Sequence, residues 1–420
     1  MTFTDKNNNK PKSLLFRKKS ENINLIIHGQ GVFLFENTDG KSSTFNLYNE
    51  DKTDGINVQF NINSIIAYQI SSGKVFFDVN NDTGLLNKNG IFYWFSFDSQ
   101  NEVLQGGIGE ARLENSKYVY VFSEHNDKSF LESLVQIEIS SNINPLKLLR
   151  DPITSDISLL IKNTNELSMD DIASNAYLPK SSLTTVAQKL YDCISGENFV
   201  LDDDNFPDFS KAIEYSIKTP GCWCYEKLKS KSTEFNPDKP NILETYLRIT
   251  LGSNSGESPG VPYVMEIWPV GHFSPVHNHS EANAIIRVLH GSINVSLFPF
   301  LCLEPEGIEP FAKVNFNKDE ITWISPTLNQ THQLKNLEEN VDTCVTIQCY
   351  MYDAEDKVHY DYFDYIDDNG KKQQYEPDSD MDFVEFKELM KKEWDMHIKS
   401  DNYTILSLIL NLRKIFTIYK

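Results

Sequence analysis

The histidines of this sequence gather in one region, and their spacing is that of metal ligands. Five of the nine histidines lie between residues 272 and 332. His277 and His279 are two residues apart, and side chains at that spacing project the same way from an extended backbone. A divalent metal ion with an open coordination position needs a third protein ligand. His332, which follows the turn-like residues 326–330, is the best candidate for that ligand.

The surroundings of His277 and His279 resemble the first motif of the cupins. That motif has a Gly, five residues, His-x-His, a Glu five residues after the second His, and a Gly seven residues later. Gly271 and Gly291 keep these spacings, whereas Ala284 stands where the Glu would be. The resemblance implies a double-stranded β-helix, or jelly-roll barrel, that holds a metal.

The second cupin motif is matched by His332 and by Asn336, four residues later. Pro326 lies one residue early for this motif, and Asn329 replaces its Gly. The second change is mild, because Asn tolerates a left-handed backbone. The resemblance covers about residues 246–352 and implies that the three histidines are the metal ligands.

A cupin that lacks the Glu but keeps three histidines resembles the thiol dioxygenases, and further residues resemble the cysteine dioxygenase branch. Tyr246 and Arg248 match a Tyr-x-Arg strand whose Arg binds the substrate carboxylate. Tyr350 matches the active-site Tyr of a later strand. The resemblance implies one iron(II) ion per chain, O2 as co-substrate, and Tyr350 and Arg248 as catalytic residues.

Two positions depart from the dioxygenase pattern. Gln348 stands where the family has a His two residues before the Tyr, and Gln is a weaker proton partner than His. Ala284 stands where animal members have a Cys that is crosslinked to the Tyr, so this crosslink is excluded. Thr346 can fill the role of the family's Ser. We expect Gln348, Thr346 and Asn336 to support the site from behind the groups that touch metal or substrate.

The implied chemistry follows from the charge of the centre. Three neutral imidazoles leave iron(II) with a net positive charge and open positions, which favours a thiolate and leaves room for dioxygen. Arg248 offers a planar fork for a substrate carboxylate. Tyr246, Trp268 and Trp323 are expected to line the substrate pocket with it. The expected reaction converts a small thiol, such as cysteine, into its sulfinic acid.

Other interpretations of these residues stay open. The histidines could be structural groups, and Arg248 could pair with one of the many acids of the chain. A cupin can also keep its barrel without catalysis, so a ligand-binding or structural protein is the alternative function. Sugar isomerisation is disfavoured, because the motif lacks its Glu and a formal net charge of −21 would repel a phosphosugar.

Composition limits the partners and the compartment. The charge of −21 and the lack of a basic stripe argue against a nucleic-acid partner. The six cysteines have no CxxC spacing, which favours free thiols in a reducing compartment. The polar N-terminus lacks the apolar core of a signal peptide, and residues 405–412 are too short an apolar run to span a bilayer. We therefore expect a cytoplasmic protein.

These groups need a scaffold, and 420 residues are enough for two domains. Residues 1–21 are polar and are expected to be disordered. Residues 22–141 carry short apolar runs between turn clusters, which predicts an antiparallel β-sandwich. Residues 92–97 and 106–110 resemble the non-catalytic β-sandwich repeat of the farnesoic acid methyltransferase family. That resemblance implies a module that contacts a protein or a carbohydrate.

The remaining segments change character twice. Residues 142–235 have the apolar spacing of helices, the first of them at 145–149, and are expected to lead into the second domain. Residues 236–366 return to strand patterns and are expected to form the cupin barrel with the metal site. Residues 367–420 begin acidic and are expected to end as a helix. The predicted fold is mainly β: an antiparallel sandwich, a helical connection and a cupin barrel.

Overall fold

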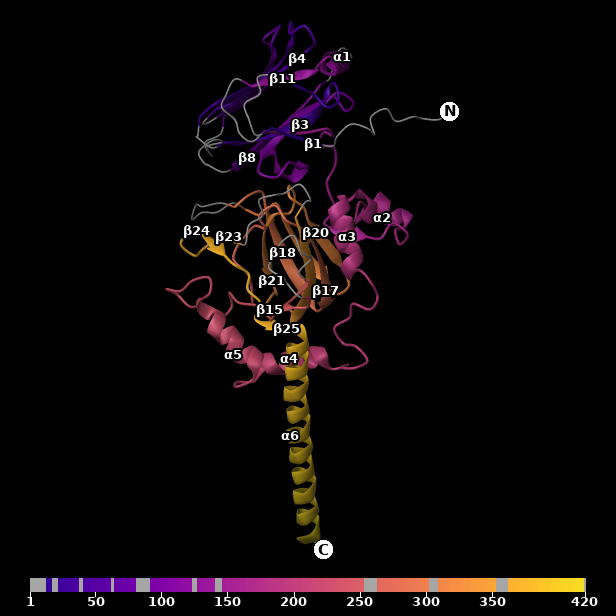
Figure 1. Cartoon of the computed structure of the whole chain (residues 1–420), viewed down its shortest axis with the longest axis vertical. Coiled ribbons are helices and arrows are strands. Elements are labelled where there is room, and N and C mark those ends of the chain that lie inside the picture. The colour runs from indigo at the N-terminus through magenta and orange to yellow at the C-terminus, as the bar shows by residue number, and fades with distance from the viewer. Residues whose placement is uncertain are drawn as a thin grey trace. The chain divides into compact units, whose positions relative to one another are not determined.

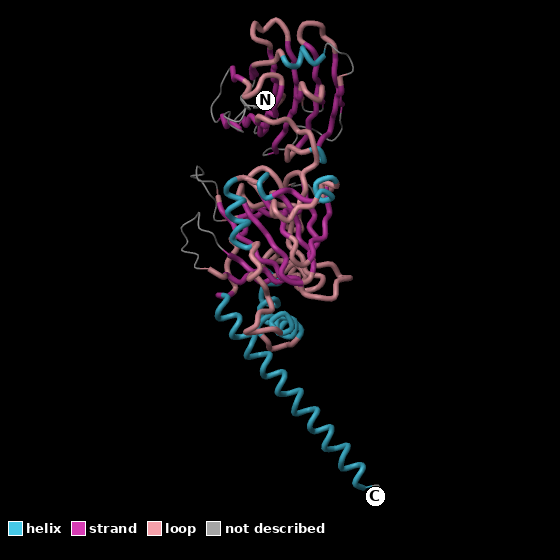
Figure 2. The backbone as a smooth tube through the Cα atoms, turned by 90° about the vertical axis from the view of Figure 1, so that its right-hand side faces the viewer, coloured by secondary structure: helices cyan, strands magenta, loops and turns pink. Residues whose placement is uncertain are grey.

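A computed structural model divides the chain into two compact units, Met1–Ile157 and Ser158–Lys420 (Figure 1). The described residues are 13–16, 22–37, 41–61, 64–80, 91–122, 127–139, 146–252, 263–301, 309–352 and 362–418. Each unit is built on strands, and Figure 2 shows these strands as two separate groups with the helices outside them.

The first unit is a sandwich of two six-stranded antiparallel sheets. One sheet has the order β1-β12-β3-β8-β9-β10, with the bounds Ser13–Phe16, Leu146–Leu149, Gln30–Asn37, Ile91–Asp98, Val103–Ile108 and Ser116–Val121. The other has the order β2-β11-β4-β5-β6-β7, with the bounds Asn22–Asn24, Gln136–Ile139, Ser43–Tyr48, Gly55–Phe60, Ser64–Gln69 and Val75–Asn80. The 3-10 turn η1 (Leu113–Asn115) and the short helix α1 (Asp127–Glu132) complete the unit.

Aromatic side chains from the two sheets fill the sandwich. Phe33 of β3 and Phe45 of β4 stack with ring centroids 4.4 Å apart. Phe95 of β8 lies 5.3 Å from Phe33, and all three rings are fully buried. Every second residue of β4 is buried, because successive side chains of a strand point to opposite faces. The predicted antiparallel sandwich is therefore confirmed.

Two segments beside the sandwich differ from the sequence-based expectation. The helix predicted at 145–149 is wrong, because Leu146–Leu149 is strand β12, which pairs with both β1 and β3. Its burial alternates residue by residue, which is the period of a strand and not of a helix. Strand β1 lies within the segment 1–21 that is expected to be disordered, and the rest of that segment lies outside the described residues.

The second unit contains an eight-stranded and a three-stranded sheet. The large sheet has the order β14-β13-β20-β17-β22-β16-β15-β25, with the bounds Tyr177–Pro179, Leu160–Lys162, Ile321–Ile324, Asn283–His290, Cys344–Met351, Tyr263–Trp268, Leu247–Thr250 and Met381–Asp382. The small sheet has the order β19-β18-β21, with the bounds Ala312–Asn317, Ser292–Phe298 and Thr331–Lys335. A hairpin of β23 (Phe363–Ile366) and β24 (Lys372–Tyr375) lies beside it.

The connections between these two sheets are those of a jelly roll. The chain crosses from the large sheet to the small one after β17, returns at β20, and crosses again to β21 and back to β22. Trp268 and Val288 of the large sheet meet Val295 and Phe316 of the small sheet in one buried cluster. The two sheets therefore enclose a common interior, and the predicted mainly β fold with a jelly-roll barrel is confirmed.

Helices cover the outside of this barrel. Helix α3 (Thr185–Ile194) packs against β17 and β22 through its buried face. The shorter elements α2 (Met169–Ala173), η2 (Lys180–Ser182), α4 (Phe209–Lys218), α5 (Trp223–Ser230) and η3 (Lys231–Thr233) complete the segment before β15. Because α3 lies on the two strands that carry pocket residues, its packing helps to hold them.

The first turn of α3 offers a test of that packing. The Thr184 hydroxyl accepts a hydrogen bond from the Ala187 amide at 3.2 Å, which caps the helix. We expect Thr184→Ala to lower the free energy of unfolding by about 1 kcal/mol. Thr184→Ser keeps the hydroxyl and should resemble the wild type. Urea denaturation of both variants measures this, and equal midpoints for the two would show that the cap contributes nothing.

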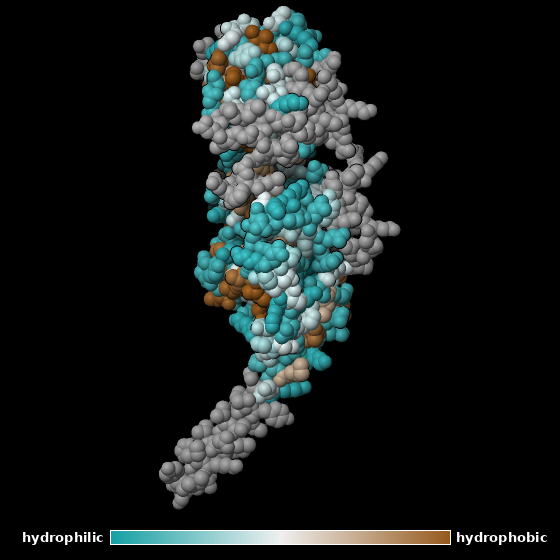
Figure 3. All heavy atoms as spheres, turned by 90° about the vertical axis from the view of Figure 1, so that its left-hand side faces the viewer, coloured by the Kyte–Doolittle hydropathy of each residue, from teal (hydrophilic) through white to brown (hydrophobic). Residues whose placement is uncertain are grey.

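The last helix, α6 (Phe383–Ile418), starts directly after β25 and packs against α4. Phe386 and Met390 are fully buried in this contact, and Phe386 lies 6.0 Å from Phe209 of α4. Within the described part of the chain, none of the helices is both long enough and apolar enough to cross a bilayer. Figure 3 shows one face of the molecule, on which hydrophilic residues predominate among those described.

The described cysteines are all free thiols, namely Cys193, Cys222, Cys224, Cys344 and Cys349. Cys302 lies outside the described residues. Burial raises the pKa of the thiols of Cys224, Cys344 and Cys349 far above the ordinary range. These three side chains are therefore protonated core residues and poor nucleophiles.

Candidate metal centre

The first histidine segment is an extended stretch held between two strands. Isolated bridges pair His277 with His332 of β21 and with Tyr365 of β23. The His277 amide donates to the His332 carbonyl at 3.0 Å, and the His332 amide donates back at 2.9 Å. On the other side, the Ile366 amide donates to the Val276 carbonyl at 3.0 Å. Main-chain hydrogen bonds therefore set the spacing between two of the three histidines.

A tight turn carries the chain from His279 into β17. Ser280 and Glu281 have φ values of 48° and 65°, in the left-handed region. The Gln330 side chain binds this turn twice, since its amide donates to the Ala282 carbonyl at 2.9 Å and its oxygen accepts from the Glu281 amide at 3.1 Å. The residues before β21 thus hold the turn of the first histidine motif in place.

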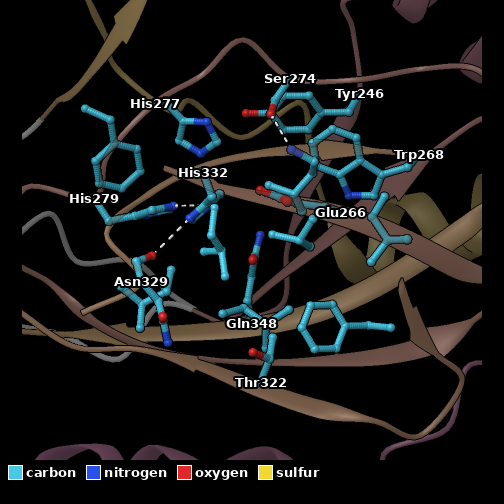
Figure 4. A pocket seen from close by; sticks show the side chains of 18 of the residues that line it. Tyr246, Glu266, Trp268, Ser274, His277, His279, Thr322, Asn329, His332 and Gln348 are labelled. Atoms are coloured by element: carbon cyan, nitrogen blue, oxygen red, sulfur yellow. Dashed lines mark hydrogen bonds between the residues drawn. The ribbon is translucent and has the colours of Figure 1, made fainter. Parts of the chain in front are cut away.

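The three imidazoles converge on one point, as Figure 4 shows, and their ligand nitrogens all lie within 4.8 Å of one another. Nε2 of His279 lies 3.2 Å from Nε2 of His332. Nδ1 of His277 lies 3.0 Å from the Pro275 carbonyl, and Nδ1 of His332 lies 3.2 Å from the Asn329 carbonyl. A carbonyl only accepts, so these Nδ1 atoms carry the protons and the Nε2 atoms are left bare.

Burial keeps all three rings neutral. It lowers the pKa of His277 to about 4 and the pKa of His332 to about 3. The pKa of His279 also falls well below its ordinary value, first through burial and then through the two neighbouring histidines. A neutral imidazole is the form that binds a metal, so the rings are ready to do so at neutral pH.

The lowered pKa values make the metal-free protein sensitive to acid. The unfolded chain takes up protons at these histidines near pH 6.5, whereas the folded chain does so only near pH 4 or 3. The unfolded state therefore binds more protons between these values, and the free energy of unfolding falls as the pH drops below about 6.5. We expect the urea midpoint of the metal-free protein to fall over this range, and to fall less in His332→Ala. Equal falls in both proteins would assign the effect to other groups.

The donor set fits a metal ion that prefers nitrogen ligands. The described group consists of three imidazoles and contains no carboxylate or thiolate. Nε2 of His279 and Nε2 of His332 lie 3.2 Å apart, close enough for one metal ion to bind both in place of the hydrogen bond that a proton on one of them makes. The position of the cupin Glu is taken by Ala284, which is buried against Tyr350 and Ile324. This group could therefore hold a transition-metal ion.

A pocket inside the barrel adjoins the histidines. Its lining is mostly aliphatic and aromatic, and it includes all four aromatic residues expected there: Tyr246, Trp268, Trp323 and Tyr350. Tyr246 and Trp268 stack with ring centroids 4.2 Å apart. The Trp323 indole donates to the Ser158 carbonyl at 3.1 Å, which fixes its orientation. The walls are therefore rigid and largely apolar.

Tyr350 lies against one of the candidate ligands. Its ring stacks on the His279 imidazole, with centroids 5.4 Å apart and planes 18° from parallel. Phe363 of β23 covers the same imidazole, with a centroid distance of 4.4 Å. Burial raises the pKa of Tyr350 well above its ordinary value, so the phenol stays protonated and can donate a hydrogen bond into the pocket.

Arg248, the expected carboxylate clamp, has a partner within the protein. Its Nη1 donates to Oε1 of Glu266 at 2.8 Å, and both side chains are buried. The two residues face each other across the ladder between β15 and β16. Burial raises the pKa of Glu266, while the charge of Arg248 acts against this rise. Arg248, Glu266 and Gln348 form the polar floor of the pocket, which thus holds a cation and an anion together.

Strand order and motif placement together decide the fold of the second unit. The first histidine motif links β16 to β17, the second enters β21, and both meet inside the jelly-roll barrel. The second unit has the cupin fold.

Comparison with known proteins finds similarity to solved structures alone. Neither a protein-family model nor a curated protein matches the sequence. The cupin domain of Cnp3 from Schizosaccharomyces pombe matches with a TM-score of 0.20 and 15% identity, over 26% of this chain and 65% of that one. The DMSP lyase DddQ from Ruegeria pomeroyi matches with a TM-score of 0.20 and 15% identity, over 26% and 49%. An L-ribose isomerase from Acinetobacter gives a TM-score of 0.20 and 15% identity, over 26% and 59%.

These similarities are confined to part of each protein. The matched part is 26% of this chain in all three comparisons and less than two thirds of each solved chain, namely 65%, 49% and 59%.

Two other expected site residues lie behind the pocket of the cupin unit. Asn336 donates through its side-chain amide to the carbonyls of Trp268 at 2.8 Å and Asp342 at 3.0 Å. It ties the end of β21 to the end of β16 and so supports the scaffold. Thr346 is fully buried opposite Glu266, and its hydroxyl has no hydrogen-bond partner among the described residues.

Sequence reasoning missed Glu266 in this cupin. One signal was present, since Glu266 is the only charged residue in the run 263–268 and has the same parity as Trp268, which is expected to face the pocket. The register that sets Glu266 opposite Arg248 is a matter of pairing between strands, which a single strand does not reveal.

Proposed function

We propose that the cupin unit is a metal-dependent thiol dioxygenase that oxidises a small thiol to its sulfinic acid. The observation that carries this proposal is the all-histidine centre, in which three buried neutral imidazoles converge and no acid joins the described group. The overall change adds both atoms of O2 to the sulfur of RSH and gives RSO2H, so atoms and electrons balance without another co-reactant. Iron(II), held by His277, His279 and His332, would supply the activation of O2 and of the thiol.

The residues around the centre would position the thiol and exclude water. The apolar walls remove bulk water from the pocket, which strengthens each polar contact inside it. Tyr350 and Phe363 both pack against the His279 ring. The Tyr350 phenol, protonated at neutral pH, can donate a hydrogen bond to an oxygen atom that is being transferred to sulfur.

A catalytically silent, ligand-binding cupin is the second candidate function. Two observations favour it: Arg248 is engaged by Glu266, and Gln348 occupies the place of a proton-transferring His. Such a protein would bind metal or ligand in the same pocket without consuming oxygen.

Aerobic incubation of the iron-loaded, full-length protein with small thiols separates the two candidates. Uptake of O2 should accompany the formation of an equal amount of sulfinate. His279→Ala should abolish both, whereas His290→Ala should keep both, because His290 lies at the end of β17 outside the histidine group. Fully iron-loaded protein that consumes neither thiol nor O2 would reject the dioxygenase and leave the binding protein.

Tyr350→Phe tests the role of the phenol. The variant keeps the ring that stacks on His279, so its metal content should equal that of the wild type. Loss of one hydrogen-bond donor should lower kcat by about 10-fold to 100-fold. Tyr365→Phe is the matched control, because its hydroxyl already donates to the Phe235 carbonyl at 3.2 Å. A Tyr350→Phe enzyme with wild-type kcat would remove the phenol from the reaction.

A further inference from the structure

The pocket carries one buried charge of each sign. Of the described residues that line it, Arg248 and Glu266 are the only Arg, Lys, Asp or Glu side chains. Their side chains are 8% and 6% exposed. No role for Glu266 follows from the cupin motifs, yet burial of a carboxylate is costly unless it is paired. Its presence in the pocket therefore bears on what the pocket accepts.

We infer that Glu266 determines specificity, so that the pocket takes thiols with an amine or another non-anionic polar end and rejects thiols that carry a carboxylate. This specificity rests on the proposed function, because it concerns the thiol that the proposed dioxygenase oxidises. The selected class is the aminothiols, of which cysteamine is the simplest.

The guanidinium of Arg248 already has a partner within the protein. An arginine recognises a carboxylate best through two parallel N–H donors. Nη1 of Arg248 already donates to Glu266 at 2.8 Å. A ligand carboxylate would have to share the guanidinium with Glu266, which would bring two anions together where burial makes repulsion strong.

The carboxylate of Glu266 can accept further hydrogen bonds. An ionised carboxylate offers about four acceptor positions, and the ion pair with Arg248 uses one of them. Figure 4 shows Glu266 and Gln348 side by side in the pocket, and the oxygen of the Gln348 amide is also an acceptor. An ammonium group of a ligand can therefore donate hydrogen bonds to these acceptors. The net charge of −21 also attracts cations to this protein.

The charged pair lies in the same pocket as the histidines. Arg248, Glu266, His277 and His279 all line it. One ligand in this pocket can thus place its sulfur at the histidines and its polar end at Glu266. Three buried donors on this floor, Nε of Arg248, Nε1 of Trp268 and Nε2 of Gln348, lack a hydrogen-bond partner in the described structure. A neutral hydroxyl or carbonyl could satisfy them without adding an anion.

Two probes with the same two-methylene spacer test the inference: cysteamine, which ends in an ammonium, and 3-mercaptopropionate, which ends in a carboxylate. Dissociation constants are measured on iron-loaded, full-length protein without oxygen, so that binding is read without turnover. The wild type should bind cysteamine about tenfold or more tightly than 3-mercaptopropionate. Glu266→Gln removes the anion, frees the guanidinium, and should shift this ratio toward 3-mercaptopropionate by about tenfold or more.

Two further variants keep the test decisive. Glu244→Gln changes another buried glutamate of the same unit that lies outside the pocket lining, and it should leave the ratio unchanged. If Glu266→Gln does not fold, the double variant Arg248→Met with Glu266→Leu removes both charges together and should bind the two thiols with similar affinity. A wild type that prefers 3-mercaptopropionate, or a ratio that stays the same without Glu266, would overturn the inference.

The outcomes separate this inference from the proposed function. Tight binding of cysteamine without any oxidation would keep the specificity of Glu266 and reject the dioxygenase. Oxidation of 3-mercaptopropionate as efficient as that of cysteamine would keep the dioxygenase and reject the role of Glu266.

Discussion

His332→Ala is expected to abolish metal binding, while the protein still folds. The histidine group supplies three ligands, and the loss of one leaves two neutral nitrogens, too few to hold a divalent ion with open positions. Loss of an outer partner of a ligand already costs about 10- to 100-fold in metal affinity, so loss of a ligand itself should cost more than that. The iron content of the purified variant should fall from one ion per chain to near zero.

Metal analysis of four proteins measures this effect: the wild type, His277→Ala, His332→Ala and the control His290→Ala. His290 is partly exposed at the end of β17, and its variant should keep the wild-type metal content. Circular dichroism verifies that each protein is folded. Metal retained in both ligand variants would refute the assignment of the centre.

Arg248→Met is expected to destabilise the cupin unit by about 3–5 kcal/mol. The substitution leaves Glu266 buried without its 2.8 Å ion-pair partner. Its carboxylate would then be protonated at a higher pH in the folded state than in the unfolded state. Protonation stabilises the folded state in that case, so the variant should recover stability as the pH falls and lose it as the pH rises.

A double variant isolates the pair from the packing around it. Arg248→Met with Glu266→Leu replaces both charges by apolar side chains, which for buried pairs is often neutral or stabilising. Urea denaturation of the two single variants and the double variant gives the interaction energy of the pair. If Arg248→Met alone costs less than about 1 kcal/mol, Glu266 is not held as an ion in the folded protein.

The parts of the site that could be predicted from the sequence are local. The two-residue spacing of His277 and His279 and the intervals to the flanking glycines are written in one short stretch. The convergence of the three histidines agrees with this prediction, although the identity of the bound metal stays a prediction. Strand patterns also predict the sandwich and the barrel, because alternation reports which face of a strand is buried.

The parts that could not be predicted depend on pairing between distant segments. Residues 146–149 are too short to separate a strand from a helix by period, and only the partners β1 and β3 decide between them. The pair of Arg248 with Glu266 depends on the register between β15 and β16. Strand β23 pairs with the His277 segment through an isolated bridge. The two segments lie far apart in the chain, so no local pattern encodes this contact.

The two-way hydrogen bonding between the backbones of His277 and His332 has a consequence for how an ion enters. Two arms of the chelate are fixed by the main chain before any ion arrives, and the left-handed turn that follows His279 is held by Gln330. The amide hydrogens of His277 and His332 should therefore exchange slowly with deuterated solvent even in the metal-free protein. Capture and release of the ion would then require little rearrangement of the backbone.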